Sequence, residues 1–543
     1  MVFARRSTTL LAAIIASCAM VLSLTACTSD NKTVVDGQTT VTSNSAGGVA
    51  VFTPSEGITL NQQTPLNKWA KLVPDLAKAL ADAGFKKGDI DHTTSDSLAK
   101  QSRAIQDFVV DHLSNNTTDD SGIAIAPDNM TLLVAPVVEA DASTRQYGDY
   151  VSQNLSTNDA TDGEATSDGE SSEDDSSKDD SSNTESDSTA SDEQAQAVDR
   201  LVSSLKLAKE SGMHVVLLGN SIEGYKPDAF VKFSDAQTIG KLQAEKMVSK
   251  LKLDKASKDN PKYIEVLLPY TAVDEKGNAN DSTFAQEAFR GIWQVLGSYY
   301  QKGVVESPSG TLDGKSTEND WQAVAYDAAK EGSTAKVLDK RLAKTDGQST
   351  LTRIDGIITM NDYIASEVVK ELDDLGYTGS AADINPQITI SGIVGNITGK
   401  KDLSRDAVPD PIKSPENDNA NDSSSSDDDA DEDTSASDKD RDSQWPLVTG
   451  YGAYVSNIPS IVNGKQWMTG MEDRQTIATD IAQACAKLNK DEALNSMPSI
   501  RNSEVGGVKK IPTISEPLLA VSASNLKSAL IDPGYISLAD AGL

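Results

Sequence analysis

Short apolar runs alternate with amphipathic segments along most of this 543-residue chain, and this alternation limits the folds it can adopt. Residues 49–52, 130–138 and 214–218 are nearly continuous apolar runs, typical of strands buried on both faces. The segments between them have apolar side chains at helical spacing, and the first carries Trp69, Val73, Leu76 and Leu80. A second series of the same kind begins at residue 263, and it includes a helix expected at residues 320–329 and a strand expected at residues 388–394. Two successive strand–helix series predict an α/β fold of two doubly wound lobes.

Residues 446–474 combine a short apolar run, a glycine-bearing loop, a helix-like segment and a second short extended run. By spacing alone this is an ordinary strand–helix–strand corner. Ligands of open α/β sheets, however, bind where parallel strands end in such loops. The loop that contains Tyr451 and Gly452 therefore has either a structural or a ligand-facing role.

The first 27 residues have the pattern of a bacterial lipoprotein signal. Arg5-Arg6 form a positive region, and residues 10–24 form an apolar run too short and too early for a membrane-spanning helix. The following sequence Leu-Thr-Ala-Cys ends at Cys27, which we expect to be acylated; an ordinary secretory peptide or an uncleaved anchor are the alternatives. We expect a soluble body, held by lipid on the extracytoplasmic face of the cell membrane through a flexible linker at residues 28–48.

Cysteine and histidine usage gives no sign of a metal site or a disulfide. Beyond the expected signal peptide and Cys27, only Cys485 is left, on an apolar helical face where a buried thiol is expected. The histidines, His92, His112 and His214, lack zinc-binding spacing and form no catalytic triad pattern. The sequence predicts no metal and no cofactor.

Two acidic tracts, residues 156–195 and 414–443, carry most of the net charge of −33. Both are rich in Ser, Asp, Glu and Asn and almost free of apolar residues, so we expect them to be disordered insertions. Neither has the ligand spacing of a calcium-binding loop. The acidity also argues against nucleic acid as a partner.

Catalytic and nucleotide-binding motifs are missing from the sequence. Around Gly399-Lys400 the first glycine of a phosphate loop is replaced by Val394 and the required Ser or Thr by Lys401. No G-x-G-x-x-G opens a helix after the first strand, and no G-x-S-x-G is found. We therefore predict a protein that is not an enzyme.

Four local motifs, in order, resemble the sugar-binding proteins of bacterial ABC importers of the ribose, xylose and galactose type. Phe233-Ser234-Asp235 with Gly240 and Ala244 is similar to the strand that precedes the second lobe. The other three are Asn361-Asp362-Tyr363-Ile364-Ala365, Thr449-Gly450-Tyr451-Gly452-Ala453 and Gly464-Lys465-Gln466-Trp467-Met468-Thr469. The resemblance covers nearly all of residues 48–542 apart from the acidic tracts.

This resemblance implies the periplasmic binding protein-like I fold, with two Rossmann-like lobes joined by a three-segment hinge that closes on ligand. The first lobe would comprise residues 49–234 and 451–513. The second would comprise residues 235–450 and 514–543. The expected partners are a small-molecule solute and the permease subunits of an ABC transporter, and a monomer is expected.

The resemblance also implies which residues face the cleft between the lobes. These are Lys68, Trp69, Asn220, Asp235, Asn361, Asp362 and Tyr451. Amide and carboxylate groups suit vicinal hydroxyls, and aromatic faces suit the apolar side of a sugar ring. Trp69 also fits simple core packing on its own helix.

Several positions depart from the family. Asn220-Ser221 stand where an Asp-Arg pair is common, and Thr283-Phe284 stand in place of two asparagines. Tyr451-Gly452 replace a Gln-Asp pair. The expected function is capture of a carbohydrate for import, although the ligand could be a larger glycoside or not a sugar. A sensory receptor and an acidic surface interaction protein are the alternatives.

Overall fold

The computed structural model describes residues 33–35, 38–40, 46–55, 65–115, 126–138, 145–150, 153–156, 185–273, 280–343, 350–382 and 444–543. The expected signal peptide, Cys27, most of the first acidic tract, the whole of the second and a strand expected at 388–394 lie outside these residues. Within the described part, no helix is both long and apolar enough to cross a bilayer.

The chain divides into two units, residues 1–45 and residues 46–543. In the first unit, β1 (Thr33–Val35) pairs antiparallel with β2 (Gln38–Thr40). Both strands lie within the linker expected at residues 28–48. Asp-Gly between two β-branched runs is a strong hairpin signal, which explains this pairing.

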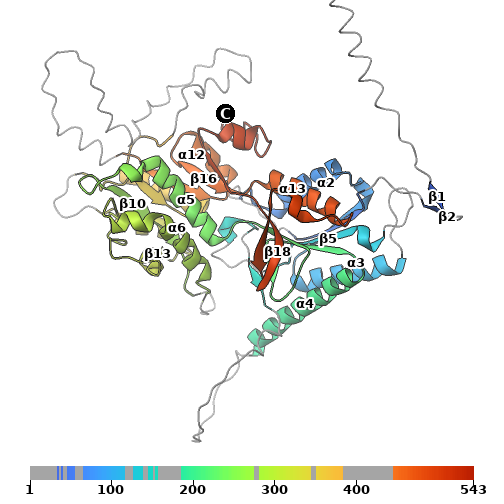
Figure 1. Ribbon diagram of the computed structural model, residues 1–543. Coiled ribbons are helices and arrows are strands. Elements are labelled where there is room, and N and C mark those ends of the chain that lie inside the picture. Colours follow the sequence, from blue (N-terminus) through green and yellow to red (C-terminus); the bar gives the residue numbers. More distant parts are fainter. Residues whose placement is uncertain are drawn as a thin grey trace, which may run out of the picture. The chain divides into compact units, whose positions relative to one another are not determined.

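The first lobe of the second unit is built on a seven-stranded sheet with helices on both faces (Figure 1). β17 (Ile500–Val505) and β18 (Val508–Ser515) pair antiparallel at one edge of this sheet, and all other neighbouring strands pair parallel. Helices α2 (Trp69–Asp82) and α13 (Arg474–Leu488) pack on one face, and α3 (Leu98–Asn115) and α4 (Glu185–Glu210) pack on the other. Across the sheet the strands are β17 (Ile500–Val505), β18 (Val508–Ser515), β9 (Ala229–Lys232), β7 (His214–Leu218), β5 (Met130–Val134), β3 (Gly48–Pro54) and β4 (Ile90–Ser95).

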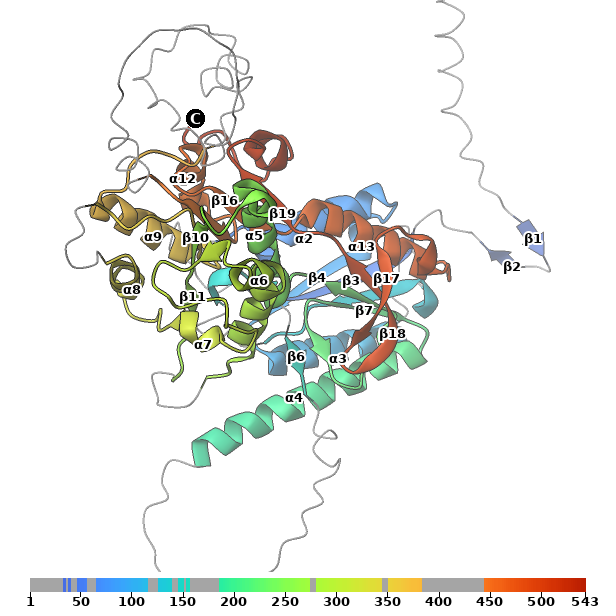
Figure 2. The same cartoon turned by 60° about the vertical axis from the view of Figure 1, so that its left-hand side comes forward.

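The second lobe is built in the same way on a six-stranded sheet (Figure 2). Helices α5 (Ala236–Leu251) and α6 (Thr283–Gln301) cover one face, and α8 (Ser333–Arg341) and α9 (Asp362–Leu375) cover the other. Only the last strand of the sheet is antiparallel to its neighbour. In order the strands are β12 (Val305–Glu306), β10 (Lys262–Val266), β14 (Gly356–Ile358), β15 (Leu447–Tyr451), β16 (Met468–Met471) and β19 (Leu519–Ser522).

Both sheets have the same doubly wound strand order. In each, the first strand of the lobe lies between the second and the third, and the fourth and fifth follow the third. The reversal point lies between β3 and β5 in the first lobe and between β10 and β14 in the second. Ligands of such sheets bind beyond the carboxyl ends of the strands at this reversal point. The predicted fold class, two doubly wound lobes with a three-segment hinge, is confirmed.

The second crossing between the lobes lies later in the chain than expected. β15 and β16 pair parallel within the second sheet, with the short helix α12 (Ile458–Val462) between them. The chain returns to the first lobe only between β16 and α13, at residues 472–473. Assigning residues 451–471 to the first lobe was therefore wrong, because residues 446–471 form one strand–helix–strand corner.

Helix α4 also begins earlier than the apolar pattern indicated. Residues 185–195, expected to belong to a disordered insertion, form its first turns. Alanine and glutamine favour helix, and acidic residues stabilise the positive end of the helix dipole. The rest of this tract lies outside the described residues.

A helix expected at residues 320–329 is much shorter in the structure. α7 covers only Trp321–Val324 and is followed directly by β13 (Ala325–Tyr326). β13 pairs parallel with β11 (Leu268–Pro269), which follows β10. This small two-stranded sheet lies at the carboxyl end of β10, beside the reversal point of the second lobe.

Candidate ligand site at the lobe junction

Lys68 and Trp69 lie after β3, at the reversal point of the first lobe. Both bind the Asp149 carboxylate: the Lys68 Nζ lies 2.8 Å from Oδ1, and the Trp69 backbone N donates to Oδ2 at 3.0 Å. The Trp69 ring is 3% exposed and packs edge-on against Tyr150 and Phe233. Trp69 therefore packs in the core of the first lobe, and Lys68 is paired within the chain.

Asn220 follows β7, and both its amide nitrogen and its amide oxygen form hydrogen bonds within the first lobe. Its Nδ2 donates to the Pro136 carbonyl at 2.9 Å, and its Oδ1 accepts from the Gln153 backbone N at 2.9 Å. The side chain is 3% exposed. It ties together two loops that follow β5 and β7.

Asp235 lies on the first crossing between the lobes and caps helix α5. Its Oδ1 accepts from the backbone N and the hydroxyl of Thr238, and its Oδ2 pairs with Lys232 at 2.8 Å. These hydrogen bonds and Lys232 lower the pKa of Asp235, against the effect of burial. The carboxylate thus stabilises the start of α5.

Asp362 opens helix α9 and is completely buried. Its carboxylate accepts from the Tyr454 backbone N at 2.9 Å, from Gln466 Nε2 at 2.7 Å and from Thr469 Oγ1 at 2.9 Å. Burial raises the pKa of Asp362 to about 6, although these donors favour the charged form. A Cβ at Gly450 would lie 2.2 Å from Asp362 Oδ1, so glycine is required beside this carboxylate.

Asn361 precedes it as the N-cap of α9. Its Oδ1 accepts from the Ile364 backbone N at 2.9 Å, and its Nδ2 donates to Gln146 Oε1 at 3.1 Å. The first contact stabilises the helix, while the second reaches a residue of the first lobe.

Tyr451 ends β15 and is 1% exposed. Its hydroxyl lies 2.5 Å from Ser234 Oγ on the first crossing and 3.4 Å from Glu472 Oε1 on the second. Glu472 also accepts from the Ser234 backbone N at 2.6 Å. Burial raises the pKa of Glu472 to about 7. Tyr451 and Glu472 therefore connect two of the three hinge crossings.

A short segment of the first lobe, residues 146–150, contacts four of the seven expected cleft residues. It binds Lys68 and Trp69 through Asp149 and Asn361 through Gln146. Its Tyr147 ring lies 6.3 Å from that of Tyr451. The structure thus brings these four positions to one place, while Asn220, Asp235 and Asp362 hold neighbouring loops and helix ends.

An open pocket of about 360 Å³ lies in the second lobe beside β11 and β13. Its walls are Tyr270, Thr271, Ala272, Val273, Trp321, Gln322, Ala325, Tyr326 and Asp327. The rings of Tyr270 and Trp321 meet edge to face, with centroids 5.1 Å apart. Asp327 is exposed, and its Oδ1 accepts from Thr271 Oγ1 at 2.9 Å. The pocket combines aromatic walls with carboxylate, amide and hydroxyl groups.

Phe284 connects this pocket to the lobe junction. It lies at the start of α6, just after Asn280, whose carbonyl accepts from the Tyr270 hydroxyl at 3.1 Å. The Phe284 ring contacts Tyr147 of the first lobe, with centroids 4.6 Å apart. The start of α6 therefore lies close both to Tyr270 of the pocket and to Tyr147 at the junction.

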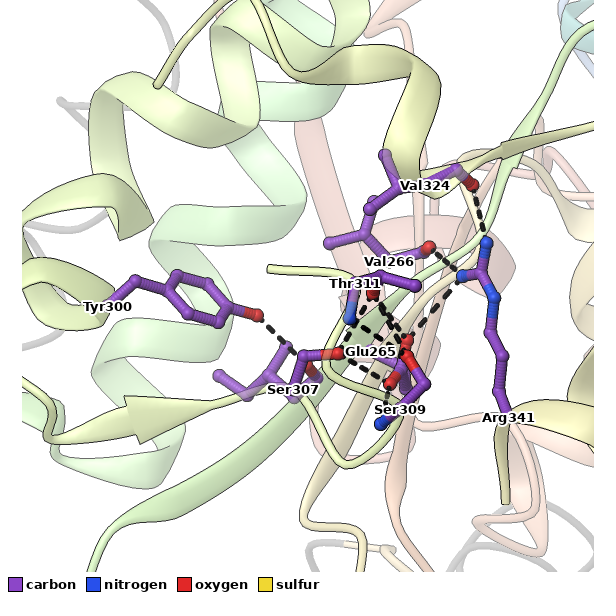
Figure 3. Close-up of polar contacts among 9 residues, drawn as sticks. Glu265, Val266, Tyr300, Ser307, Ser309, Thr311, Val324 and Arg341 are labelled. Atoms are coloured by element: carbon purple, nitrogen blue, oxygen red, sulfur yellow. Dashed lines mark hydrogen bonds and ion pairs between the residues drawn. The ribbon is translucent and has the colours of Figure 1, made fainter. Parts of the chain in front are cut away.

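A buried ion pair between Arg341 and Glu265 lies next to the segment that leads into β13 (Figure 3). Arg341 Nη1 lies 3.5 Å from Glu265 Oε2, and its Nη2 donates to the Val324 carbonyl at 2.9 Å, directly before β13. The other Glu265 oxygen accepts from the Ser307 hydroxyl at 2.6 Å and the Ser309 backbone N at 2.8 Å. Because every charge here has a partner, this cluster has a structural role and fixes α7 and β13 on the sheet.

The sequence analysis missed the pocket and the 146–150 segment. The available signal for Trp321 was a single tryptophan directly after the polar residues 315–320. Nothing in the local sequence of residues 146–150 indicates that they reach the second lobe. Among the described residues, no group of His, Cys, Asp and Glu is arranged to hold a metal ion. Cys485 is buried, and burial raises the pKa of its thiol.

No protein-family model and no curated protein matches this chain. Solved structures do. A solute-binding protein from Clostridium phytofermentans with bound β-D-glucose is 16% identical, with 91% of this chain and 99% of that chain covered and a TM-score of 0.44. A carbohydrate-transporter solute-binding protein from Chloroflexus aurantiacus in complex with D-glucose is 18% identical, with 92% and 98% covered and a TM-score of 0.42.

An arabinose-binding protein from Geobacillus stearothermophilus is 9% identical, with 89% of this chain and 99% of that chain covered and a TM-score of 0.40. The strand order of the two sheets itself defines the fold of this chain. Several of the matching structures are described as solute-binding proteins of ABC transporters, among them one with bound D-allose and a ribose transporter protein.

Proposed function

We propose that this protein is an extracytoplasmic solute-binding lipoprotein that captures a carbohydrate and delivers it to an ABC permease. The observation that carries the proposal is the aromatic-walled pocket at the carboxyl end of β10. It lies beside the reversal point of the second sheet, where ligands of doubly wound folds bind.

The chemistry of the pocket suits a sugar. Tyr270 and Trp321 supply flat apolar faces for the carbon–hydrogen side of a pyranose ring. Asp327, Gln322 and Thr271 supply acceptors and donors for hydroxyl groups. A volume of about 360 Å³ lies within the range of small-molecule sites, roughly 300–1,000 Å³.

A thermal-shift panel of monosaccharides and oligosaccharides tests this proposal on the full chain. A bound sugar at about 100 times its Kd stabilises the protein by roughly 2.7 kcal/mol. Trp321→Ala removes one aromatic wall and is expected to weaken sugar binding about tenfold, or by about 1.4 kcal/mol. Titration calorimetry of both proteins measures the difference.

Tyr299→Ala is the matched control, because Tyr299 is a partly exposed aromatic residue at the far end of α6. It is expected to bind the sugar as the unaltered chain does. If no sugar stabilises the protein while another class of solute does, the carbohydrate proposal fails. If Trp321→Ala binds as tightly as the control, the pocket is not the site.

The lipid anchor is a separate part of the proposal and rests on the sequence ending at Cys27. Cys27→Ser is expected to move the protein from the membrane fraction to the soluble fraction. Membrane fractionation with immunodetection measures this change, and Cys485→Ser serves as the control because that thiol is buried in the first lobe. A Cys27→Ser protein that stays in the membrane fraction would rule out acylation as the anchor.

A further inference from the structure

The 146–150 segment contacts residues that the sequence analysis expected to bind the solute. Its Asp149 carboxylate receives the Lys68 ammonium and the Trp69 backbone N–H, two groups expected to hold solute. Its backbone is fixed on the first lobe as well, since the Asp149 N donates to the Asn67 carbonyl at 2.8 Å. A Cβ at Gly148, where φ is +97°, would lie 2.5 Å from that carbonyl oxygen, so only glycine allows this approach.

Tyr150 adds an aromatic anchor to the first lobe. Its ring stacks on Phe233, with centroids 4.6 Å apart, and its hydroxyl donates to the Lys68 carbonyl at 2.5 Å. Burial raises the pKa of Tyr150 well above its ordinary value, so the hydroxyl keeps its proton and donates at physiological pH.

The other end of the segment binds the second lobe. Gln146 accepts from Asn361 Nδ2 at 3.1 Å through its side chain and from the Tyr454 hydroxyl at 2.6 Å through its carbonyl. Tyr147 is 1% exposed and packs between Phe284 and Tyr451. Five consecutive residues thus make polar and aromatic contacts with both lobes at once, as a ligand bound between them would.

We propose that the 146–150 segment is an internal ligand that holds the two lobes together without solute. When a sugar enters the pocket of the second lobe, Gln146 and Tyr147 must give up their contacts with that lobe, including the contact of Tyr147 with Phe284. The proposal rests on the proposed function for the identity of the solute and for the pocket that takes it. A solute that binds only after the segment has released the second lobe binds more weakly, in proportion to the fraction of ligand-free molecules in the released state.

Spin-label distances between the lobes test the first part without any ligand. One label is placed at Ser203 on α4 and one at Lys340 on α8, both exposed, in a chain with Cys18 and Cys27 replaced by serine. The double variant Gln146→Ala/Tyr147→Ala removes the contacts with the second lobe. We expect its distance distribution to shift and broaden relative to the unaltered chain.

Asp149→Asn tests the same segment from the first lobe, and Asp228→Asn is its matched control. Each aspartate joins one lysine and one backbone N–H of the first lobe: Asp228 pairs with Lys209 at 2.8 Å and accepts from the Val215 N at 2.8 Å. Only Asp149 belongs to the segment. We expect Asp149→Asn to broaden the distances and Asp228→Asn to leave them unchanged.

Sugar affinity tests the second part, with D-glucose and L-arabinose as probes in titration calorimetry. If the segment occupies the junction in about nine-tenths of ligand-free molecules, its release tightens binding about tenfold. The double variant and Asp149→Asn should therefore bind more tightly than Asp228→Asn. Weaker binding by the segment variants would overturn the proposal, since the segment would then be part of the sugar site.

The two proposals fail in different ways. Unchanged interlobe distances in both segment variants, with normal circular dichroism, would show that the segment does not hold the lobes and would overturn the inference. Shifted distances without binding of any sugar would support the segment's role and contradict the carbohydrate proposal.

Discussion

Two aspartates of the second lobe, Asp362 and Asp327, show how differently its two polar regions are built. Asp362 lies after β14, is fully buried and accepts hydrogen bonds from Tyr454, Gln466 and Thr469. Asp327 lies after β13 on the rim of an open pocket, is exposed and accepts from the Thr271 hydroxyl and the Ala329 backbone N. A carboxylate at the carboxyl end of a strand is therefore not always accessible. The packing around it decides whether it faces open volume.

The same contrast holds for the aromatic residues. Tyr451 ends β15 and Trp69 begins α2, and both are buried among residues of the protein itself. Trp321 and Tyr270 are only partly buried and border open volume. The family-like motifs thus mark residues that hold helix starts, loops and hinge crossings in place, whereas the pocket uses residues outside those motifs.

The largest expected effect is a difference in unfolding free energy between alanine variants of Asp362 and Asp327. Asp362→Ala leaves buried donors of Tyr454, Gln466 and Thr469 without their acceptor, which should cost about 3–5 kcal/mol of unfolding free energy. Asp327→Ala removes two exposed hydrogen bonds and should cost at most about 1 kcal/mol. Urea unfolding followed by circular dichroism measures both.

Equal losses of unfolding free energy in the two variants would contradict the distinction between a buried structural carboxylate and an open one. Measuring sugar binding by the same variants tests the distinction independently. Asp327→Ala is expected to fold normally and bind sugar more weakly, while Asp362→Ala should lose stability first.

A smaller effect concerns Glu472, the buried carboxyl between the hinge crossings. Its pKa of about 7 in the folded protein lies above the ordinary 4.5, so the folded state binds this proton more tightly than the unfolded chain does. The unfolding free energy therefore falls as pH rises from about 4.5 to about 7. Glu472→Gln keeps an acceptor for the Ser234 N–H without the charge, and at pH 8 it should be more stable by on the order of 2–3 kcal/mol.

Urea unfolding at pH 4.5 and pH 8 measures this difference, which should nearly vanish at the lower pH. Glu492→Gln is the control, since Glu492 is fully exposed and Lys487 lowers its pKa. Its exposed pairing predicts little change at either pH. A Glu472→Gln protein no more stable than the unaltered chain at pH 8 would contradict the assignment of a buried, destabilising charge at the hinge.

Prediction from sequence worked best where a pattern repeats along the chain. The alternation of apolar runs and amphipathic helices predicted two doubly wound lobes, because every strand buried on both faces must be nearly all apolar. Prediction worked less well at residues 446–474, where the family resemblance implied a crossing between the lobes at residue 451. The strand pairing of Thr449 with Met468 keeps this corner in the second lobe.

Short elements were also difficult to predict. Residues 320–329 have enough apolar spacing for a helix, yet α7 stops at Val324. The Arg341 guanidinium binds the Val324 carbonyl, and β13 pairs with β11 instead of continuing the helix. Arg341 is distant in sequence, so no local pattern could indicate this end.

The sequence by itself determined the order of strands and helices, the two-lobe α/β class and the residue types at strand ends, because these follow from local periodicity and burial. Only the tertiary structure decided which of those residues border open space. In the 146–150 segment, Asp149 binds Lys68, 81 residues away in sequence, and Gln146 binds Asn361, 215 residues away. Contacts at such separations depend on how the lobes pack, and local spacing carries no information about them.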